Sequence, residues 1–388
     1  MPFSPRVAVT CAALAGVALL AFGSGSSRAQ GQVDWVKDGK AGYFVSFIEY
    51  GFSRGGAQQT GACPGGLTTG YMLSSQADAD RAAFTRALTT PSGQNLCQNP
   101  EAGQPDPRFK VVTGANVPVY GIDLDGQDSH LHGRAAPGTC AHDDFRGVDG
   151  GRGIDDQFFR VVGCSQSYQP TGQGNTFNEG MLVGEWGILI TLAGVDDIRN
   201  DNDVQVMVAA SADPAQLSPS RQPLQNATYA LDQDPRFRAT MQGRIVNGVL
   251  TTDQADVRMH FVINSMRFER VLRHARMRVT LNADGTLEGF LSGYTPVDNA
   301  YDLGYGFRSG KDGNGALSRL RIPSSIGNAR VMNHTCQGAY YALKANADGD
   351  RDPATGECTS LSTQYHIRAI PAFVVDAATQ SVNETLAH

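Results

Sequence analysis

The chain has 388 residues and a formal net charge of −6, and its acidic residues are 30 Asp against only 8 Glu. Glu favours helices, whereas Asp and Gly collect in turns and caps, so this composition argues against a helix bundle or a coiled coil. An apolar content of 41% suffices for a core and excludes wholesale disorder, and no membrane-length apolar run occurs after the N-terminus.

Residues 1–29 are expected to form a cleaved secretory signal. Arg6 precedes an apolar stretch over 7–22, and Ser27 and Ala29 supply the small residues of a cleavage site. An uncleaved anchor helix is the alternative. Cleavage changes the net charge to −8, because the segment holds two Arg and no acid. The mature chain is therefore expected to be periplasmic or extracellular, with no further membrane span.

Six cysteines remain after cleavage, and an even number in an exported chain predicts disulfides. Proximity along the chain favours the pairs Cys63–Cys97, Cys140–Cys164 and Cys336–Cys358. Free thiols or metal ligation are the alternatives. A thioredoxin-like redox pair is excluded by motif, because no CxxC occurs.

The region before residue 181 is expected to be mostly irregular. The run YFVSFIEY at 43–50 predicts a strand, and helical spacing predicts a helix over 77–88. A short strand is expected within 110–119 and one further piece of regular structure at 158–163. Residues 120–180 are dominated by Asp, Gly, His and Cys, which favour loops.

The chain after residue 181 carries strand signals. Apolar runs or alternating patterns predict strands at 186–193, 204–208, 237–241, 257–261, 277–281 and 287–294. Asn247-Gly248 and Asp284-Gly285 are typical of hairpin turns. Residues 264–274 fit either a helix or a strand. Several short strands separated by turns predict a mainly β protein with an antiparallel sandwich or jelly-roll core.

The C-terminal part adds a helix and a strand. Residues 333–347 have helical spacing, and Asp348-Gly349 should end the helix. Pro371 within the strand at 367–375 predicts an edge position or a bulge. We expect one domain over 30–388, in which an irregular part (30–180) precedes the sandwich strands (181–300) and a C-terminal helix and edge strand (301–388).

An acidic segment over 123–156 predicts a calcium site. It holds eight Asp among Gly-rich turns, and Ca²⁺ prefers six to eight oxygen ligands on such flexible loops. The segment has no Glu for an EF-hand, so a solvated loop is the alternative. The expected ligands of a structural Ca²⁺ are Asp123, Asp125, Asp128, Asp149 and Asp155.

Other candidate metal ligands give weaker signals. Asp348, Asp350 and Asp352 begin like an EF-hand but lack its Gly and Glu, and the acids over 196–203 fit a turn. His130, His132 and His142 could bind a transition metal, although solvated loop histidines explain them as well.

Arginines dominate the polar phase of three alternating strands. Alternation places them on the face opposite the apolar residues, where guanidinium groups could bind carboxylate or sulfate groups. A solvated face paired with nearby Asp is the alternative. The expected ligand-binding residues are Arg236, Arg238, Arg258, His260, Arg276 and Arg278.

Two segments, TCAHDDFRGVDGGRGIDDQFFRVVGC and DPATGECTSLSTQYHIRAIPAF, are similar to secreted bacterial proteins of no assigned activity, and the similarity implies no chemistry. From the residues we expect an exported, calcium-stabilised protein that binds an anionic glycan or an envelope component. Nucleic acid is disfavoured by the charge of −8. The alternatives are a polysaccharide lyase or hydrolase that uses His260 or Tyr294, and an accessory protein of another exported enzyme.

Overall fold

The computed structural model describes a large part of the chain, and every structural statement below refers to that part. The described residues are 35–52, 61–68, 82–83, 86–114, 117–129, 135–169, 172, 180–182, 186–263, 266–305, 307–311, 317–320, 329, 332 and 334–377. The expected signal over 1–29, His130, His132 and most of the expected helix at 77–88 lie outside them.

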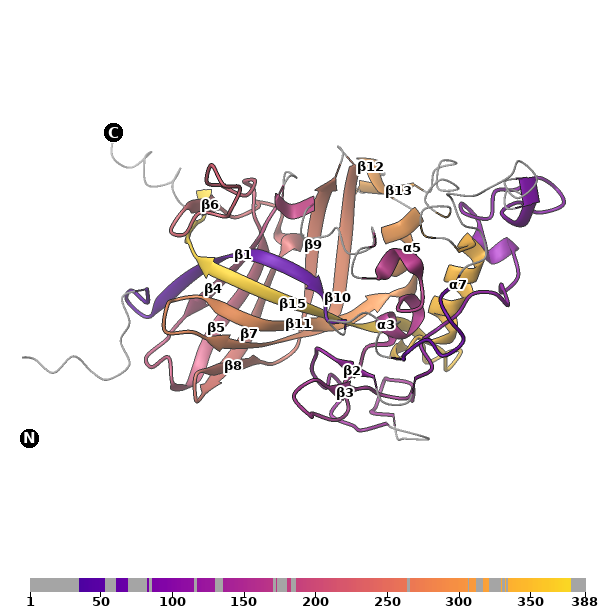
Figure 1. The fold of residues 1–388 in the computed structure, drawn as a ribbon. Helices are drawn as coiled ribbons and strands as arrows, with labels where there is room; N and C mark the ends of the chain where they lie inside the picture. Colours follow the sequence, from indigo (N-terminus) through magenta and orange to yellow (C-terminus); the bar gives the residue numbers. More distant parts are fainter. Residues whose placement is uncertain are drawn as a thin grey trace, which may run out of the picture.

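Most of the described strands join one antiparallel sheet (Figure 1). The sheet closes on itself, because β10 pairs both with β8, its neighbour in the strand order, and with β11, the strand at the opposite end of that order. The mainly β, antiparallel and sandwich-like class expected from the sequence is confirmed. In spatial order the strands are β11 (Leu287–Pro296), β15 (Cys358–Pro371), β1 (Lys40–Tyr50), β4 (Ile188–Ala193), β5 (Asn200–Ala210), β7 (Arg238–Val246), β8 (Val249–Thr252) and β10 (Met266–Leu281).

Alternation along the strands builds the core inside this sheet. In β7 the buried side chains Ala239, Met241 and Ile245 alternate with exposed ones, which is the half-buried pattern read from the sequence. They share one core with inward residues of β4, β5, β10 and β15, for example Ile190 and Ile367. On the other face of the sheet, Leu189 of β4 and Ala209 of β5 belong to a separate buried cluster, and Gln364 of β15 is also buried.

Both predicted hairpin turns are confirmed. Asn247 and Gly248 join β7 to β8 with φ of +52° and +80°, the left-handed conformation that Asn-Gly adopts in two-residue hairpins. Gly285 joins β10 to β11 with φ of +83°. The segment 264–274 is open to two interpretations in sequence, and its described residues, 266–274, belong to the long strand β10. The first half of β10 pairs with β9 (Ala255–Ile263). Beyond β10 the sheet continues through β12 (Phe307–Lys311) and β13 (Leu317–Leu320).

The helices gather near one end of the sheet (Figure 1). The expected piece at 158–163 is α3 (Gln157–Val162), capped by the carboxylate of Asp156, which accepts from Phe159 N at 3.0 Å. Two longer helices of the described part of the chain are α5 (Val297–Tyr305) and α7 (Cys336–Ala345), and α7 lies within the helix expected at 333–347. No helix among the described residues is long and apolar enough to cross a membrane.

Short elements complete the fold. Among the described residues of the expected strand at 110–119, Pro118–Val119 form β2, which pairs with β3 (Arg146–Gly147). The expected edge strand at 367–375 is corrected by the structure: its first part belongs to β15, which lies between β11 and β1, and Pro371 is the last residue of that strand. The rest forms β16 (Phe373–Val375), which pairs with β6 (Thr228–Ala230). The remaining elements are β14 (Gly349–Arg351), which pairs with β15, and the 3-10 turns η2 (Pro100–Ala102), η3 (Gln166–Tyr168) and η5 (Pro235–Phe237).

The six described cysteines form disulfides, but the pairs expected from sequence proximity are wrong. The bonds are Cys63–Cys164, Cys97–Cys336 and Cys140–Cys358, with sequence separations of 101, 239 and 218 residues. One bond, Cys63–Cys164, closes within the irregular part, and the other two leave it. These two bonds tie it to α7 and to the first residue of β15, so partners meet across the fold.

Candidate cation site and arginine-lined cavity

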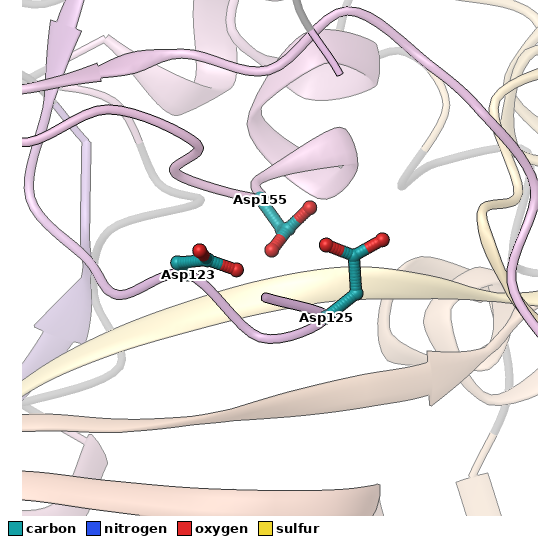
Figure 2. Close-up of side chains that lie close together, drawn as sticks. All are labelled: Asp123, Asp125 and Asp155. Atoms are coloured by element: carbon teal, nitrogen blue, oxygen red, sulfur yellow. The ribbon is translucent and has the colours of Figure 1, made fainter. Parts of the chain in front are cut away.

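Three aspartates of the acidic segment converge beside β15 (Figure 2). Asp123, Asp125 and Asp155, called the acidic triad below, each place one carboxylate oxygen within 4.8 Å of the others. Asp155 is buried, with 5% of its surface exposed, and the other two are half-buried. Three carboxylates at this spacing repel one another unless a cation neutralises them, and hard oxygen ligands suit Ca²⁺.

Local backbone hydrogen bonds fix the orientation of these carboxylates. Asp123 Oδ1 accepts from Gly126 N at 2.6 Å, and Gly126 has a φ of +78°, which favours Gly at this turn. Asp125 Oδ1 accepts from Gln127 N at 2.8 Å. Asp155 Oδ2 accepts from Leu124 N at 2.6 Å, which joins the two halves of the triad directly.

Gln364 of β15 attaches both halves of the acidic triad to the sheet. Its fully buried amide Nε2 donates to Ile122 O at 2.9 Å and to Asp155 O at 2.5 Å, and Oε1 accepts from Ile122 N at 3.0 Å. A buried amide satisfied on both sides positions the loops rigidly. Sequence reasoning missed Gln364, because a Gln within a strand carries no motif.

Further buried carboxylates surround the triad. Asp348, one of the two residues expected to end the helix, is 5% exposed, and burial raises its pKa to about 7. Burial, together with repulsion by Asp125 and Asp123, raises the pKa of Asp144 to about 6. Burial and the charges of Asp348 and Asp144 also raise the pKa of Asp155 well above its usual range. The site therefore holds more negative charge than its environment stabilises.

The other expected calcium ligands lie outside the acidic triad. Asp128 forms an ion pair with Arg152 at 2.7 Å. Asp149 is exposed, accepts from Gly151 N at 2.9 Å and lies 3.9 Å from Arg278. Asp350 of the weaker acidic loop forms an ion pair with Arg273, and its Oδ1 lies 3.2 Å from His274 Nε2.

The described histidines do not assemble a metal site. His142 Nε2 lies 3.0 Å from Ala347 O, and burial lowers its pKa. His334 is buried with Nδ1 3.1 Å from Ser165 Oγ, and burial lowers its pKa to about 3.

Four of the six expected ligand-binding side chains form close pairs with carboxylates, and a fifth, Arg278, has the longer contact of 3.9 Å with Asp149 given above. Arg236 pairs with Asp234 and Glu269, and Arg258 pairs with Glu269 as well. The other two pairs are Arg238 with Asp376 at 2.8 Å and His260 with Asp232 at 3.0 Å. Arg236, Arg238, Arg258 and His260 therefore fit the alternative given in the sequence analysis, in which the basic strand face is solvated and paired with nearby carboxylates.

Arg276 and Arg278 instead line a surface cavity of about 560 Å³, called the first cavity below. Arg244 of β7, which sequence reasoning missed, lies in the same wall. The cavity also includes Asp123 of the acidic triad, and the charge of Arg276 acts to lower the pKa of Asp123 against the larger effect of burial. A carboxylate of the acidic triad and three guanidinium groups thus line one cavity.

The residues named for a lyase or hydrolase do not line this cavity. Tyr294 is 3% exposed, lies under Gly349, and has a pKa raised by burial. His260 is 8% exposed and bonded to Asp232. Neither geometry presents a general base to a ligand in the first cavity.

Comparison with known proteins gives no match: no family model, curated protein or solved structure is similar to the chain.

Proposed function

We propose that this is an exported protein that binds Ca²⁺ at the acidic triad and an anionic glycan in the adjoining first cavity. The observation that carries the proposal is the position of Asp123, which belongs both to the triad and to the cavity wall lined by Arg244, Arg276 and Arg278. Three disulfides support an oxidising compartment, where such bonds persist.

The charge balance supports Ca²⁺ at the triad. Asp155 is buried, and among the described residues its hydrogen-bond donor is Leu124 N on one oxygen only, so the other remains for a ligand. A divalent cation would offset the repulsion among Asp123, Asp125 and Asp155 and the field of buried Asp348 and Asp144. Main-chain carbonyls or water would complete the coordination that Ca²⁺ requires.

The first cavity supports an anionic ligand once the cation is bound. Its lining has three Arg and two Asp, and Ca²⁺ would neutralise Asp123. The other aspartate, Asp253, already accepts from Gln242 N at 2.8 Å. Planar guanidinium groups bind carboxylate and sulfate in bidentate fashion, so uronate or sulfated sugar units suit this wall.

Affinity measurements on defined variants test the proposal. Uronate and sulfated oligosaccharides are titrated into wild type, Arg276→Ala and the control Arg236→Ala, each in Ca²⁺ and in EDTA. We expect Arg276→Ala to weaken binding at least tenfold and Arg236→Ala, whose guanidinium pairs with Asp234 and Glu269, to leave it unchanged. Wild-type binding should also weaken in EDTA. Absence of wild-type binding, or equal affinity of both variants, would refute the proposal.

A further inference from the structure

A second cavity adjoins the first and shares Arg278 with it. It has a volume of about 300 Å³ and lies over β10, β11 and β15 beside the loop that carries Tyr120 and Asp149. Because one side chain lines both cavities, a ligand longer than one sugar unit can extend from the first into the second. A small free anion would occupy only the first.

The second cavity differs in charge from the first. The basic side chains among its described lining residues, Arg278 and His366, each face a carboxylate. Arg278 lies 3.9 Å from Asp149, and His366 lies 2.9 Å from Glu288 and 3.2 Å from Glu49. An anionic sugar here would meet Asp149 and Glu288 without an uncompensated cation, so like-charge repulsion disfavours it.

Aromatic rings supply the other part of the second cavity wall. Phe290 and Tyr120 both line it and are half-buried, so part of each ring is accessible. Phe290 packs against Ile122, Leu124 and Tyr294, which fixes its ring. A rigid aromatic side chain can pack against the apolar face of an uncharged sugar ring, while a few polar groups orient the sugar. Because the aromatic rings are already held in place, this packing has a low entropic cost.

Resting on the proposed function, we propose that the ligand is an oligosaccharide in which anionic and uncharged sugar units alternate. The anionic unit occupies the first cavity against Arg244 and Arg276, and the adjoining uncharged unit lies against Phe290 and Tyr120 in the second. Arg278 lies between the two units. A homopolymer of uronic acid would place a carboxylate beside Glu288 and bind more weakly.

The test compares two hexasaccharides in Ca²⁺: alternating glucuronate and N-acetylglucosamine, and a uronate homopolymer. The variants are Phe290→Leu, which keeps apolar packing but removes the ring, and Glu288→Gln, which removes the charge. Melting temperature checks the fold of each variant. We expect wild type to bind the alternating oligosaccharide at least tenfold more tightly. Phe290→Leu should lose most of that preference, and Glu288→Gln should strengthen binding of the homopolymer.

Equal or tighter wild-type binding of the homopolymer would overturn the inference, as would a Phe290→Leu variant with an unchanged preference. In both cases calcium-dependent binding of an anionic glycan would stand. Absence of binding to either oligosaccharide would overturn the inference together with the proposed function, which separates the two failures.

Discussion

Replacing Asp348 by Asn should stabilise the metal-free protein at neutral and alkaline pH. Asp348 Oδ1 accepts from Ser362 N at 2.7 Å, and an Asn side chain retains this acceptor. The substitution therefore removes the buried charge while leaving the backbone bond in place. Asp348 is outside the acidic triad, so the proposed calcium ligands are kept.

The size of the effect follows from the pKa of Asp348. Burial raises it from the ordinary 3.8 to about 7, and this difference corresponds to roughly 4 kcal/mol. The folded state holds the proton of Asp348 more tightly than the unfolded state does. Proton binding by wild-type Asp348 therefore contributes its full stability to the fold below pH 3.8, and this contribution is lost as the pH rises through about 7. At pH 8 the ionised carboxylate opposes folding, and at pH 4 it does not.

Urea denaturation of chelator-stripped protein at pH 4.5 and pH 8 measures this effect. We expect Asp348→Asn to raise the free energy of unfolding by up to roughly 4 kcal/mol at pH 8 and by much less at pH 4.5. The matched control is Asp256→Asn, an exposed residue whose Oδ1 accepts from His274 N at 3.0 Å. It should change stability by less than about 0.5 kcal/mol at either pH. Equal effects of Asp348→Asn at the two pH values would refute the reasoning.

Three further predictions concern the cation, the disulfides and the packing. Calcium should raise the melting temperature of wild type and of the control Asp128→Asn, because Asp128 pairs with Arg152 outside the triad. It should not raise that of Asp155→Asn, which lacks a carboxylate of the triad; a calcium-induced rise in Asp155→Asn would contradict the site. Replacing Cys140 and Cys358 together by Ser should cost about 2–5 kcal/mol in urea denaturation, since this bond closes a separation of 218 residues; an unchanged midpoint would contradict it. Gly349→Ala would place a methyl group 2.2 Å from Tyr294 Cδ1 and should cost about 1–3 kcal/mol; calorimetry showing wild-type stability would contradict this contact.

The sequence predicted the strands well, because alternation is a local signal. The phase of Ala239 and Met241 on β7 and the turn at Asn247-Gly248 both appear in the structure where periodicity and turn chemistry placed them. What periodicity could not supply is strand order. Nothing local predicts that β1 and β15, at opposite ends of the chain, pair with each other.

The disulfides and the candidate site show the same limit. Cys97 meets Cys336 because the irregular part packs on α7, a contact over 239 residues that sequence proximity cannot reveal. The density of Asp between 123 and 156 located the acidic segment, but not which carboxylates converge. Asp348 lies about 190 residues after the acidic segment, directly before β14. The pairing of β14 with β15 brings it next to the converging carboxylates.

The arginine pattern was informative only in part. Alternation predicted that the six basic residues share the outer phase of three strands, but Arg236 lies in the 3-10 turn η5 before β7. Nor could alternation show that neighbouring carboxylates pair closely with four of the six and lie 3.9 Å from Arg278. Arg244 entered the first cavity from a strand where it follows a Gly and gives no distinct signal. Partners from other strands therefore decide which arginines face a ligand.

Calorimetric titration of an anionic oligosaccharide into protein with and without Ca²⁺ tests the central claim most directly. Wild type should bind in Ca²⁺, and removal of Ca²⁺ or the Asp155→Asn substitution should weaken that binding at least tenfold. Binding of the same affinity in Ca²⁺, in EDTA and in Asp155→Asn would contradict the joint cation and anion site.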